Sequence, residues 1–185
     1  HGVGVIGPGG RGTLAHYGLT LDDVPILVGT LGKAFGTSGA FVAGSAELID
    51  YLIQRARSYI YTTALPPATA VATSAALRVA AEEPWRRTQV LEHVTRWRTH
   101  AVNSGWASRL LPSLTPIQPL LVGDSARAVA VSTRLFERGF WVSAIRPPTV
   151  PPGTARLRIT LSAAHTAEHI DALCAALSEV LVDEA

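Results

Sequence analysis

One short segment of the sequence combines residue types that could do covalent chemistry, Thr30-Leu31-Gly32-Lys33-Ala34-Phe35-Gly36. Lys33 is the one lysine among 16 basic residues, the others all being arginine. A lysine amine condenses with carbonyl compounds when desolvation or a neighbouring cation lowers its pKa, whereas a guanidinium stays protonated. The glycines let a ligand approach the backbone closely, and the Thr30 hydroxyl could bind a phosphate. The residues alone leave two interpretations open, a carbonyl-binding lysine and an exposed loop lysine.

Two glycine motifs resemble nucleotide-binding sequences but lack their required context. Residues 2–7 match the G-x-G-x-x-G pattern, yet Pro8 follows where a dinucleotide site needs the start of a helix. Gly32-Lys33 lacks the other parts of a phosphate loop, because Leu27 replaces the first glycine and Ala34 replaces the final hydroxyl residue. We therefore expect neither a nicotinamide or flavin site nor a nucleoside triphosphate site.

The segment from His165 to His169 has the H-x-x-E-H spacing of some zinc proteases. That chemistry needs both histidines on one helical face, whereas Thr166 is expected to cap the helix and to leave His165 outside it. Glu168 in the first turn is explained by the helix dipole. We expect a capped, solvated helix start and no metal site.

The composition describes an ordinary globular chain of 185 residues, with 48% hydrophobic residues, 16% charged residues and a formal net charge of +2. This balance excludes a disordered chain, and no apolar run reaches the ~18 residues of a membrane span. The arginines are scattered, which argues against nucleic-acid binding. Cys174 is the only cysteine, so we expect a reducing, cytoplasmic location. The chain begins at His1 and contains no methionine, which predicts an incomplete translation product.

The first part of the sequence reads as a glycine-rich loop followed by short strands and helices. Residues 26–28 predict a buried strand and residues 40–44 a second strand, after which Ser45 caps a helix. The aromatic and β-branched residues 59–63 predict an extended segment. Two helices are expected next, one from the Pro66-Pro67 pair to about residue 81 and one from Pro84 to about residue 102.

The second part of the sequence predicts a compact α+β lobe in the order β-α-β-β-α. Its expected elements are strands at 117–122, 140–145 and 155–161, a helix at 125–138, and a last helix that Thr166 caps. Within the helix at 84–102, Val90, Val94, Trp97 and Ala101 form the expected buried stripe. We place the boundary between the two parts after residue 86, inside the long helix.

The segment around Lys33 resembles the α-oxoamine synthases, which are fold-type I enzymes that use pyridoxal 5′-phosphate (PLP). The resemblance covers essentially the whole chain and includes residues 1–4, residues 59–63 and the Pro66-Pro67 pair. Residues 117–119, 123–124 and 145–151 resemble the biotin-pathway branch of the family most. The implied fold class is α/β, with the chain corresponding to the C-terminal part of such an enzyme. Residues 1–86 would be the end of the PLP-binding large domain, and residues 87–185 the small α+β domain.

The resemblance also implies roles for individual residues. Lys33 would bind PLP covalently and act as the base that removes the α-proton of the amino acid. Thr30 would bind the phosphate, and His1 would stack over the ring or contact its 3′-oxygen. Thr149 and Arg158 would contact the substrate, with the Arg158 guanidinium matched to a carboxylate. The resemblance implies no metal ion.

The implied reaction is the decarboxylative condensation of L-alanine with pimeloyl-CoA, or with the same acyl group on a carrier protein, in biotin synthesis. The family also implies a homodimer. The family's acidic partner of the pyridine nitrogen lies just upstream of the residue that matches His1, so we expect this chain alone to be inactive. Two alternatives remain: a glycine-using synthase of the same family, and a truncated non-catalytic remnant.

Overall fold

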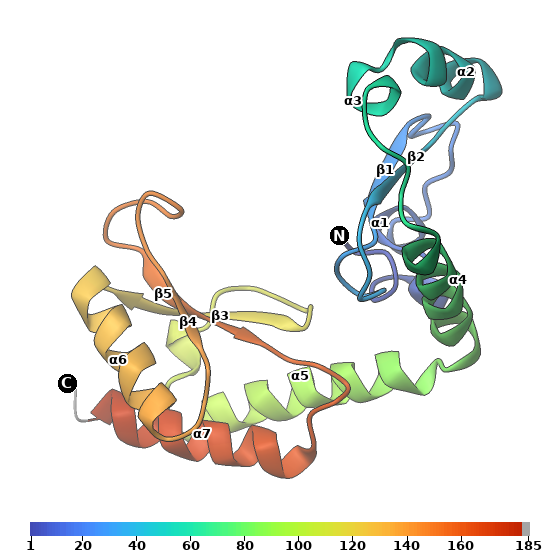
Figure 1. Cartoon of the computed structure of the whole chain (residues 1–185). Helices are drawn as coiled ribbons and strands as arrows, with labels where there is room; N and C mark the ends of the chain where they lie inside the picture. The colour runs from blue at the N-terminus through green and yellow to red at the C-terminus, as the bar shows by residue number, and fades with distance from the viewer. Residues whose placement is uncertain (183–185) are drawn as a thin grey trace. The chain divides into compact units, whose positions relative to one another are not determined.

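The computed structural model describes residues 1–182 and divides into two compact units, His1–Trp85 (unit 1) and Arg86–Ala185 (unit 2). This division lies one residue before the boundary placed from the sequence. Each unit has its own sheet, two-stranded in unit 1 and three-stranded in unit 2 (Figure 1).

Unit 1 is built around a β-hairpin. Strands β1 (Leu27–Thr30) and β2 (Ala40–Ala43) pair in antiparallel register, with Gly29 opposite Phe41 and Thr30 opposite Ala40. Before the hairpin the chain forms only two short helical turns, η1 (Pro8–Gly10) and α1 (Thr13–His16). The expected strand at 40–44 is confirmed, as is the mainly irregular start of the chain.

Three helices follow the hairpin: α2 (Ala46–Arg55), α3 (Arg57–Ile60) and α4 (Pro67–Glu82). The predicted cap of α2 is confirmed, because the Ser45 hydroxyl accepts a hydrogen bond from the Leu48 amide. Pro67 occupies the first position of α4, where its missing N–H leaves no bond unmade. The predicted start of this helix is therefore also confirmed.

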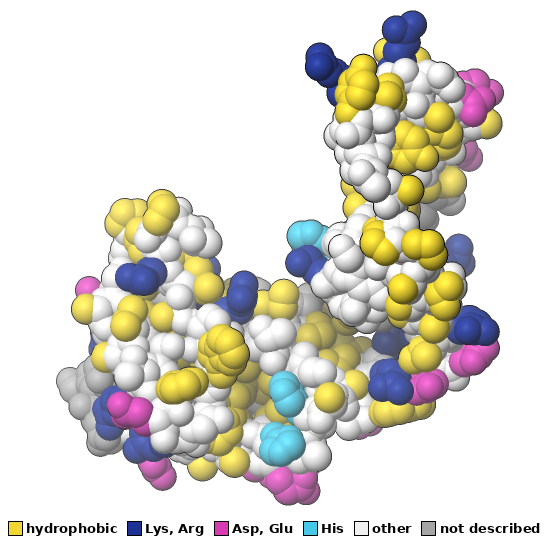
Figure 2. All heavy atoms as spheres, viewed as in Figure 1, with side chains coloured by type: hydrophobic (Ala, Val, Ile, Leu, Met, Phe, Trp, Pro, Cys, Tyr) yellow, Lys and Arg dark blue, Asp and Glu magenta, His cyan; other side chains and the backbone are white. Residues whose placement is uncertain are grey.

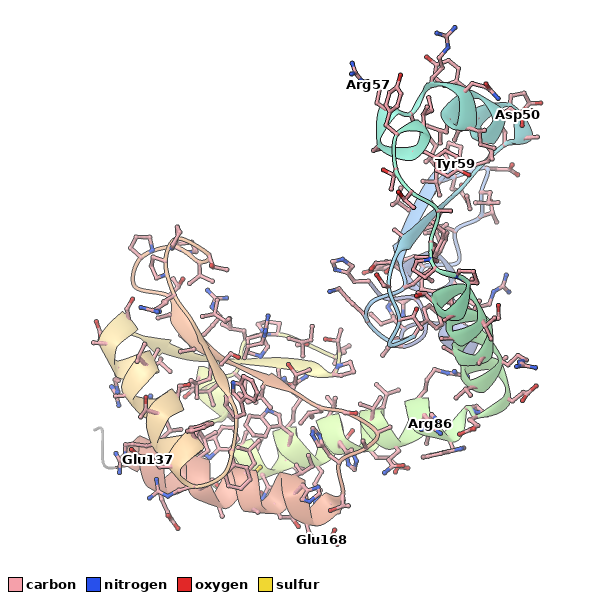
Figure 3. The ribbon with its side chains drawn as sticks, viewed as in Figure 1. Asp50, Arg57, Tyr59, Arg86, Glu137 and Glu168 are labelled. Carbon is pink, nitrogen blue, oxygen red and sulfur yellow. The ribbon has the colours of Figure 1, made fainter. Side chains whose placement is uncertain are left out.

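The extended segment predicted at residues 59–63 is wrong. The chain forms the short helix α3 and then a turn, because the amides of Tyr59 and Ile60 both donate to the Ala56 carbonyl at 2.9 Å. The Thr62 hydroxyl donates to the Ser58 carbonyl one turn back. Figure 3 shows Arg57 and Tyr59 as side chains of this helix. Local hydrogen bonds thus override the strand propensity of the aromatic residues.

The strand at 26–28 exists, but the prediction that it is buried is wrong. Ile26 is 52% exposed and Val28 is 65% exposed. In the described chain β1 pairs only with β2, and Val28 lies opposite Val42, which is exposed as well. Figure 2 shows hydrophobic side chains on the surface of this unit. Phe35 is the only buried hydrophobic side chain of unit 1.

Unit 2 has the expected β-α-β-β-α order after a long helix. Its elements are α5 (Trp85–Asn103, which begins one residue before the boundary), η2 (Ala107–Arg109), β3 (Ile117–Gly123), α6 (Ser125–Glu137), β4 (Ser143–Ile145), β5 (Ala155–Thr160) and α7 (Ala167–Val182). The antiparallel sheet has the order β3-β5-β4. Helices α5, α6 and α7 lie on one side of it (Figure 1).

One face of the sheet and these three helices enclose the core of unit 2. On β5, Ala155, Leu157 and Ile159 are buried, whereas Arg158 and Thr160 on the alternate positions are exposed. The predicted stripe on α5 is confirmed, with Val90, Val94, Trp97 and Ala101 all buried in this core. The opposite face of β5 therefore remains accessible.

The strand predicted at 140–145 is shorter than expected. The Phe140 amide donates to the Leu135 carbonyl in the last turn of α6, so pairing with β5 begins only at Ser143. At the other end of the lobe, the predicted cap of α7 is confirmed, because the Thr166 hydroxyl accepts from the His169 amide. Figure 3 shows Glu168 in the first turn of α7, directed away from the sheet.

None of the helices within residues 1–182 is both long and apolar enough to cross a membrane. Within the same residues, no group of three or more His, Cys, Asp or Glu side chains is placed to hold a metal ion.

Candidate functional site

Lys33 lies in the loop that joins the two strands of the hairpin, residues 31–39, here called the Lys33 loop. The loop is closed at its base, where the Leu31 amide donates to the Gly39 carbonyl at 2.9 Å. Within it the Gly36 amide donates to the Lys33 carbonyl, and the Thr37 amide donates to the Leu31 carbonyl. The hairpin thus presents the only lysine of the chain on a short, internally bonded loop.

The Lys33 side chain is exposed, and among residues 1–182 its amine has no hydrogen-bond or ion-pair partner. Thr30 is half-buried at the end of β1, three residues before it, and its hydroxyl accepts a hydrogen bond from the Gly32 amide at 3.4 Å. A free primary amine therefore lies on the loop, and a hydroxyl lies three residues earlier at the end of the strand that leads into it. These groups fit a ligand that carries a carbonyl and a phosphate.

The start of the chain packs directly against the Lys33 loop. Gly4 has φ +90°, and a Cβ built on it would lie 2.7 Å from the Cβ of Ala34. The buried Phe35 ring lies next, 3.5 Å from the same position. Because no real side chain fits at that distance, glycine is required at position 4. His1 is exposed and opens the segment whose Gly4 contacts the residue after Lys33.

A pair of threonines that the sequence analysis did not find connects the Lys33 loop to α4. The Thr73 hydroxyl donates to the Thr37 hydroxyl at 2.9 Å and is also 2.8 Å from the Thr69 carbonyl. Thr37 in turn donates to the Leu31 carbonyl at 3.1 Å. The two residues are 36 positions apart, so no local pattern in the sequence indicates their contact.

The other two predicted site residues belong to unit 2. Arg158 is on the open face of β5, between Pro119 of β3 and Ser143 of β4. Its guanidinium is exposed and has no partner within the described chain. The neighbouring Arg156 is instead engaged, since it donates to the carbonyl and the hydroxyl of Thr154 at 3.0 Å each. Of the two strand arginines, Arg158 is therefore the one free to bind an anion.

Thr149 is exposed on the loop that leads from β4 to β5. Its amide donates to the Arg146 carbonyl at 3.1 Å. The same loop is fixed at its far end by the Arg156–Thr154 bonds. The structure thus places His1, Thr30 and Lys33 in unit 1, and Thr149 and Arg158 in unit 2.

Charged and titratable side chains of unit 2 also connect α5 and α7. Asp171 of α7 accepts from Arg96 and His100 of α5, and the Arg96 bond holds the pKa of that carboxyl down at about 2. Burial, together with the neighbouring His169 and His93, lowers the pKa of His165. These groups join α5 and α7 and stabilise the fold of the lobe.

Cys174, the only cysteine, is buried in the core of unit 2. Burial raises the pKa of its thiol to about 12, so the thiolate is not formed at neutral pH. Cys174 therefore acts as a core residue.

The family model of aminotransferases of class I and II matches residues 1–177. The chain belongs to this family. All five predicted site residues lie within the matched range.

Relatives within the aminotransferase family are close. The 8-amino-7-oxononanoate synthase of Methylococcus capsulatus is 61% identical over 185 residues, which is 100% of this chain and 47% of the relative. The enzyme of the same name from Saccharophagus degradans is 56% identical over 183 residues, covering 98% of this chain and 45% of the relative. The chain spans about half the length of the curated relatives that it matches. The expectation that it corresponds to their C-terminal part stays a prediction.

Solved structures of the family share the fold. The 8-amino-7-oxononanoate synthase of Francisella tularensis is 31% identical, with a TM-score of 0.86 over 100% of this chain and 53% of that chain. The serine palmitoyltransferase of Sphingomonas wittichii is 28% identical, with a TM-score of 0.91 over 99% of this chain and 46% of that chain. The expected α/β fold class and the resemblance inferred from the sequence are both confirmed.

Proposed function

We propose that this chain carries the PLP-binding lysine and part of the substrate site of an 8-amino-7-oxononanoate synthase. The reaction joins L-alanine to pimeloyl-CoA, or to the same acyl group on a carrier protein, and releases carbon dioxide and the free thiol. The observation that supports this most is the free amine of Lys33, the only lysine, on the hairpin loop of a chain 61% identical to an enzyme of that name. We place the reaction in the cytoplasm, with a homodimer as the working assembly.

The groups present on the Lys33 loop fit PLP. The amine of Lys33 matches the aldehyde of the cofactor, and the Thr30 hydroxyl at the end of β1 matches its phosphate. One solved structure, of a serine palmitoyltransferase (SPT), is named as SPT with a PLP internal aldimine. This chain is 26% identical to it in sequence, with a TM-score of 0.90. When bound, PLP supplies the electron sink for the bond broken at the amino acid's α-carbon.

The residues of unit 1 hold the cofactor and move one proton. Lys33 would hold the cofactor covalently. Once the amino group of the substrate has displaced it, the free Lys33 amine would accept the proton from the α-carbon of the amino acid. Thr30 donates a hydrogen bond to the phosphate, and His1 contacts the ring. The close packing of Gly4 on Ala34 fixes the segment that begins at His1 against the loop that carries Lys33.

The residues of unit 2 bind the substrate. Arg158 offers two parallel N–H donors to a carboxylate, a geometry that a lysine could not match. Its position opposite Pro119 and Ser143 keeps the guanidinium on the open face of the sheet. Thr149 on the neighbouring loop offers a hydroxyl to the substrate. Residues 1–86 would end the large domain of the enzyme, and residues 87–185 would form its small domain.

A second candidate is a sister synthase that uses another amino acid. The TM-score with serine palmitoyltransferase, 0.91, favours considering it, although the sequence identity of 28% is well below the 61% of the first relative. A substrate assay distinguishes the two candidates. Glycine, L-alanine and L-serine are each supplied with an acyl thioester, and the assay measures the thiol that is released. Exclusive use of L-alanine supports the first proposal, and exclusive use of glycine or serine contradicts it.

The decisive experiment for the cofactor uses the 185-residue chain, PLP and borohydride. Lys33 is the only side-chain amine, so reduction should attach one phosphopyridoxyl group to the peptide that contains it. Lys33→Arg should abolish this product, because a guanidinium cannot condense with the aldehyde. The variant keeps the N-terminal amine of His1 and therefore measures any background reaction there. Equal phosphopyridoxyl labelling of the unaltered chain and of the Lys33→Arg variant would contradict the role of Lys33.

A further inference from the structure

Helix α4 has 16 residues, and Thr73 is the only one that is buried. An amphipathic helix normally buries a stripe of apolar side chains. In α4 the apolar Val71 and Leu77 are 70% and 50% exposed, and the buried position is occupied by a hydroxyl. The single buried contact of this helix is therefore polar and directional, and its partner is Thr37 of the Lys33 loop.

The hydrogen bonds at this contact form a continuous chain. Thr73 donates to the Thr37 hydroxyl and shares its proton with the Thr69 carbonyl of its own helix. The bond to Thr69 fixes the rotamer of Thr73. The hydroxyl and the amide of Thr37 both donate to the Leu31 carbonyl, each at 3.1 Å. The chain of bonds thus runs from a helix backbone to the residue two positions before Lys33.

We infer that Thr37 and Thr73 form a hydroxyl clamp that positions the Lys33 loop, and that both are positioning residues for the Lys33 amine. The inference rests on the proposed function where it concerns PLP. The clamp ties the loop to α4, whereas the other backbone bonds of Thr37 and Gly36 are internal to the loop and would move with it. The contact between Gly4 and Ala34 supports the loop from another segment but carries no hydrogen bond.

The test compares Thr73→Val with matched variants in the 185-residue chain. Valine keeps the shape of threonine and removes the donor, so the amides of Leu31 and Thr37 should exchange with deuterium about fivefold faster. Thr73→Ser keeps the hydroxyl and should restore slow exchange. Ser74→Ala is the control, because Ser74 makes the same kind of bond to the carbonyl four residues earlier, at Ala70, but is exposed.

A second readout separates positioning from stability. The dissociation constant of PLP from Lys33, measured by borohydride trapping, should rise about fivefold in Thr73→Val and stay within about twofold in Ser74→Ala. In the double variant Thr37→Val/Thr73→Val, two apolar groups of the right shape replace the hydroxyl pair, so stability should recover. PLP binding should not recover there, because the directional bond is still missing. Recovery of both would show a merely structural contact and overturn the inference.

The outcomes remain distinct if the proposed function fails. If the unaltered chain forms no PLP product at Lys33, the cofactor proposal is wrong, whereas amide exchange still decides whether the clamp holds the loop. If Thr73→Val does not fold, the double variant keeps the packing and gives the exchange result. Slow exchange at Leu31 and Thr37 in a folded variant that lacks the hydroxyl pair would contradict the clamp.

Discussion

Unit 1 buries a single hydrophobic side chain, Phe35, whereas unit 2 contains every other buried hydrophobic residue of the described chain. Large apolar side chains that remain exposed show the opposite distribution, with most of them in unit 1. Glycine follows the same division, since only Gly105, Gly123, Gly139 and Gly153 of the 16 glycines lie in unit 2. Unit 2 is thus held by a hydrophobic core, and unit 1 by backbone hydrogen bonds and close glycine contacts.

This difference separates the folding of the chain from the presentation of one reactive side chain. Burial of apolar surface is the main driving force of folding, and unit 2 contains nearly all of the buried hydrophobic residues. Unit 1 presents the amine of Lys33 at a defined place but has little core beneath it. Positioning of Lys33 therefore depends on a few specific contacts, Gly4 with Ala34 and Thr37 with Thr73.

The largest expected effect tests the core of unit 2 against the surface of unit 1 with one type of substitution. Leu157→Ala removes a side chain that is 0% exposed and should lower the free energy of unfolding by about 2–5 kcal/mol. Leu77→Ala removes one that is 50% exposed and should change it by less than about 0.5 kcal/mol. Urea unfolding followed by far-ultraviolet circular dichroism measures both, because each unit contains helices. Similar losses in the two variants would contradict the comparison.

An intermediate effect is expected from a glycine pair in unit 1. Gly4→Ala and Gly18→Ala share the strain of a positive φ, +90° and +68°. Only at position 4 would the new Cβ meet another atom, the Ala34 Cβ at 2.7 Å, whereas nothing lies within 4 Å at position 18. Gly4→Ala should therefore speed amide exchange of Gly36 and Thr37 by about tenfold, and Gly18→Ala by much less. Equal exchange in both variants would show that the contact does not hold the Lys33 loop.

The smallest effect concerns pH and should be confined to unit 2. The His165 Nδ1 accepts from the Ser162 amide, and the pKa of His165 is lowered from 6.5 by burial, then by His169 and His93. Because the folded pKa is depressed, this stability is complete above pH 6.5 and is lost as the pH falls through the window below it.

The melting temperature of unit 2 should therefore fall as the pH drops below 6.5, and less so in His165→Asn, which keeps an acceptor that does not titrate. His16→Asn in unit 1 is the control. It should leave the pH dependence of unit 2 unchanged. If the melting temperature of His165→Asn falls with pH as much as that of the unaltered chain, a group other than His165 causes the fall.

Local signals were sufficient to predict where three of the helices begin. Ser45, Pro67 and Thr166 each mark a helix start within one residue of the observed position, because caps and proline act on the backbone next to them. The buried stripe of α5 was also predictable, since its 3.6-residue period depends on that helix alone. The candidate site was also found from a local feature, the residue types around Lys33. The assignment of PLP to that site came from the resemblance to the α-oxoamine synthases.

Features that depend on what packs against a segment were not predictable. The run of Ile26 and Val28 looked buried because it is apolar, but exposure depends on whether another layer covers the hairpin. Tyr59 favours strands, yet its amide bonds locally to Ala56. The contact of Thr37 with Thr73 joins residues 36 positions apart through two hydroxyls, and neither residue stands out in the sequence.

The hairpin of unit 1 has a further consequence. Strands β1 and β2 pair only with each other in the described chain, so the outer edge of each strand presents N–H and C=O groups that no other strand of unit 1 satisfies. Open edges of this kind accept additional strands. Val28 and Val42 lie opposite each other in this hairpin, and both side chains are exposed. An additional strand could therefore make apolar side-chain contacts with them as well. Sheet extension at these edges would make the chain prone to self-association at high concentration and would begin beside the segment that carries Lys33.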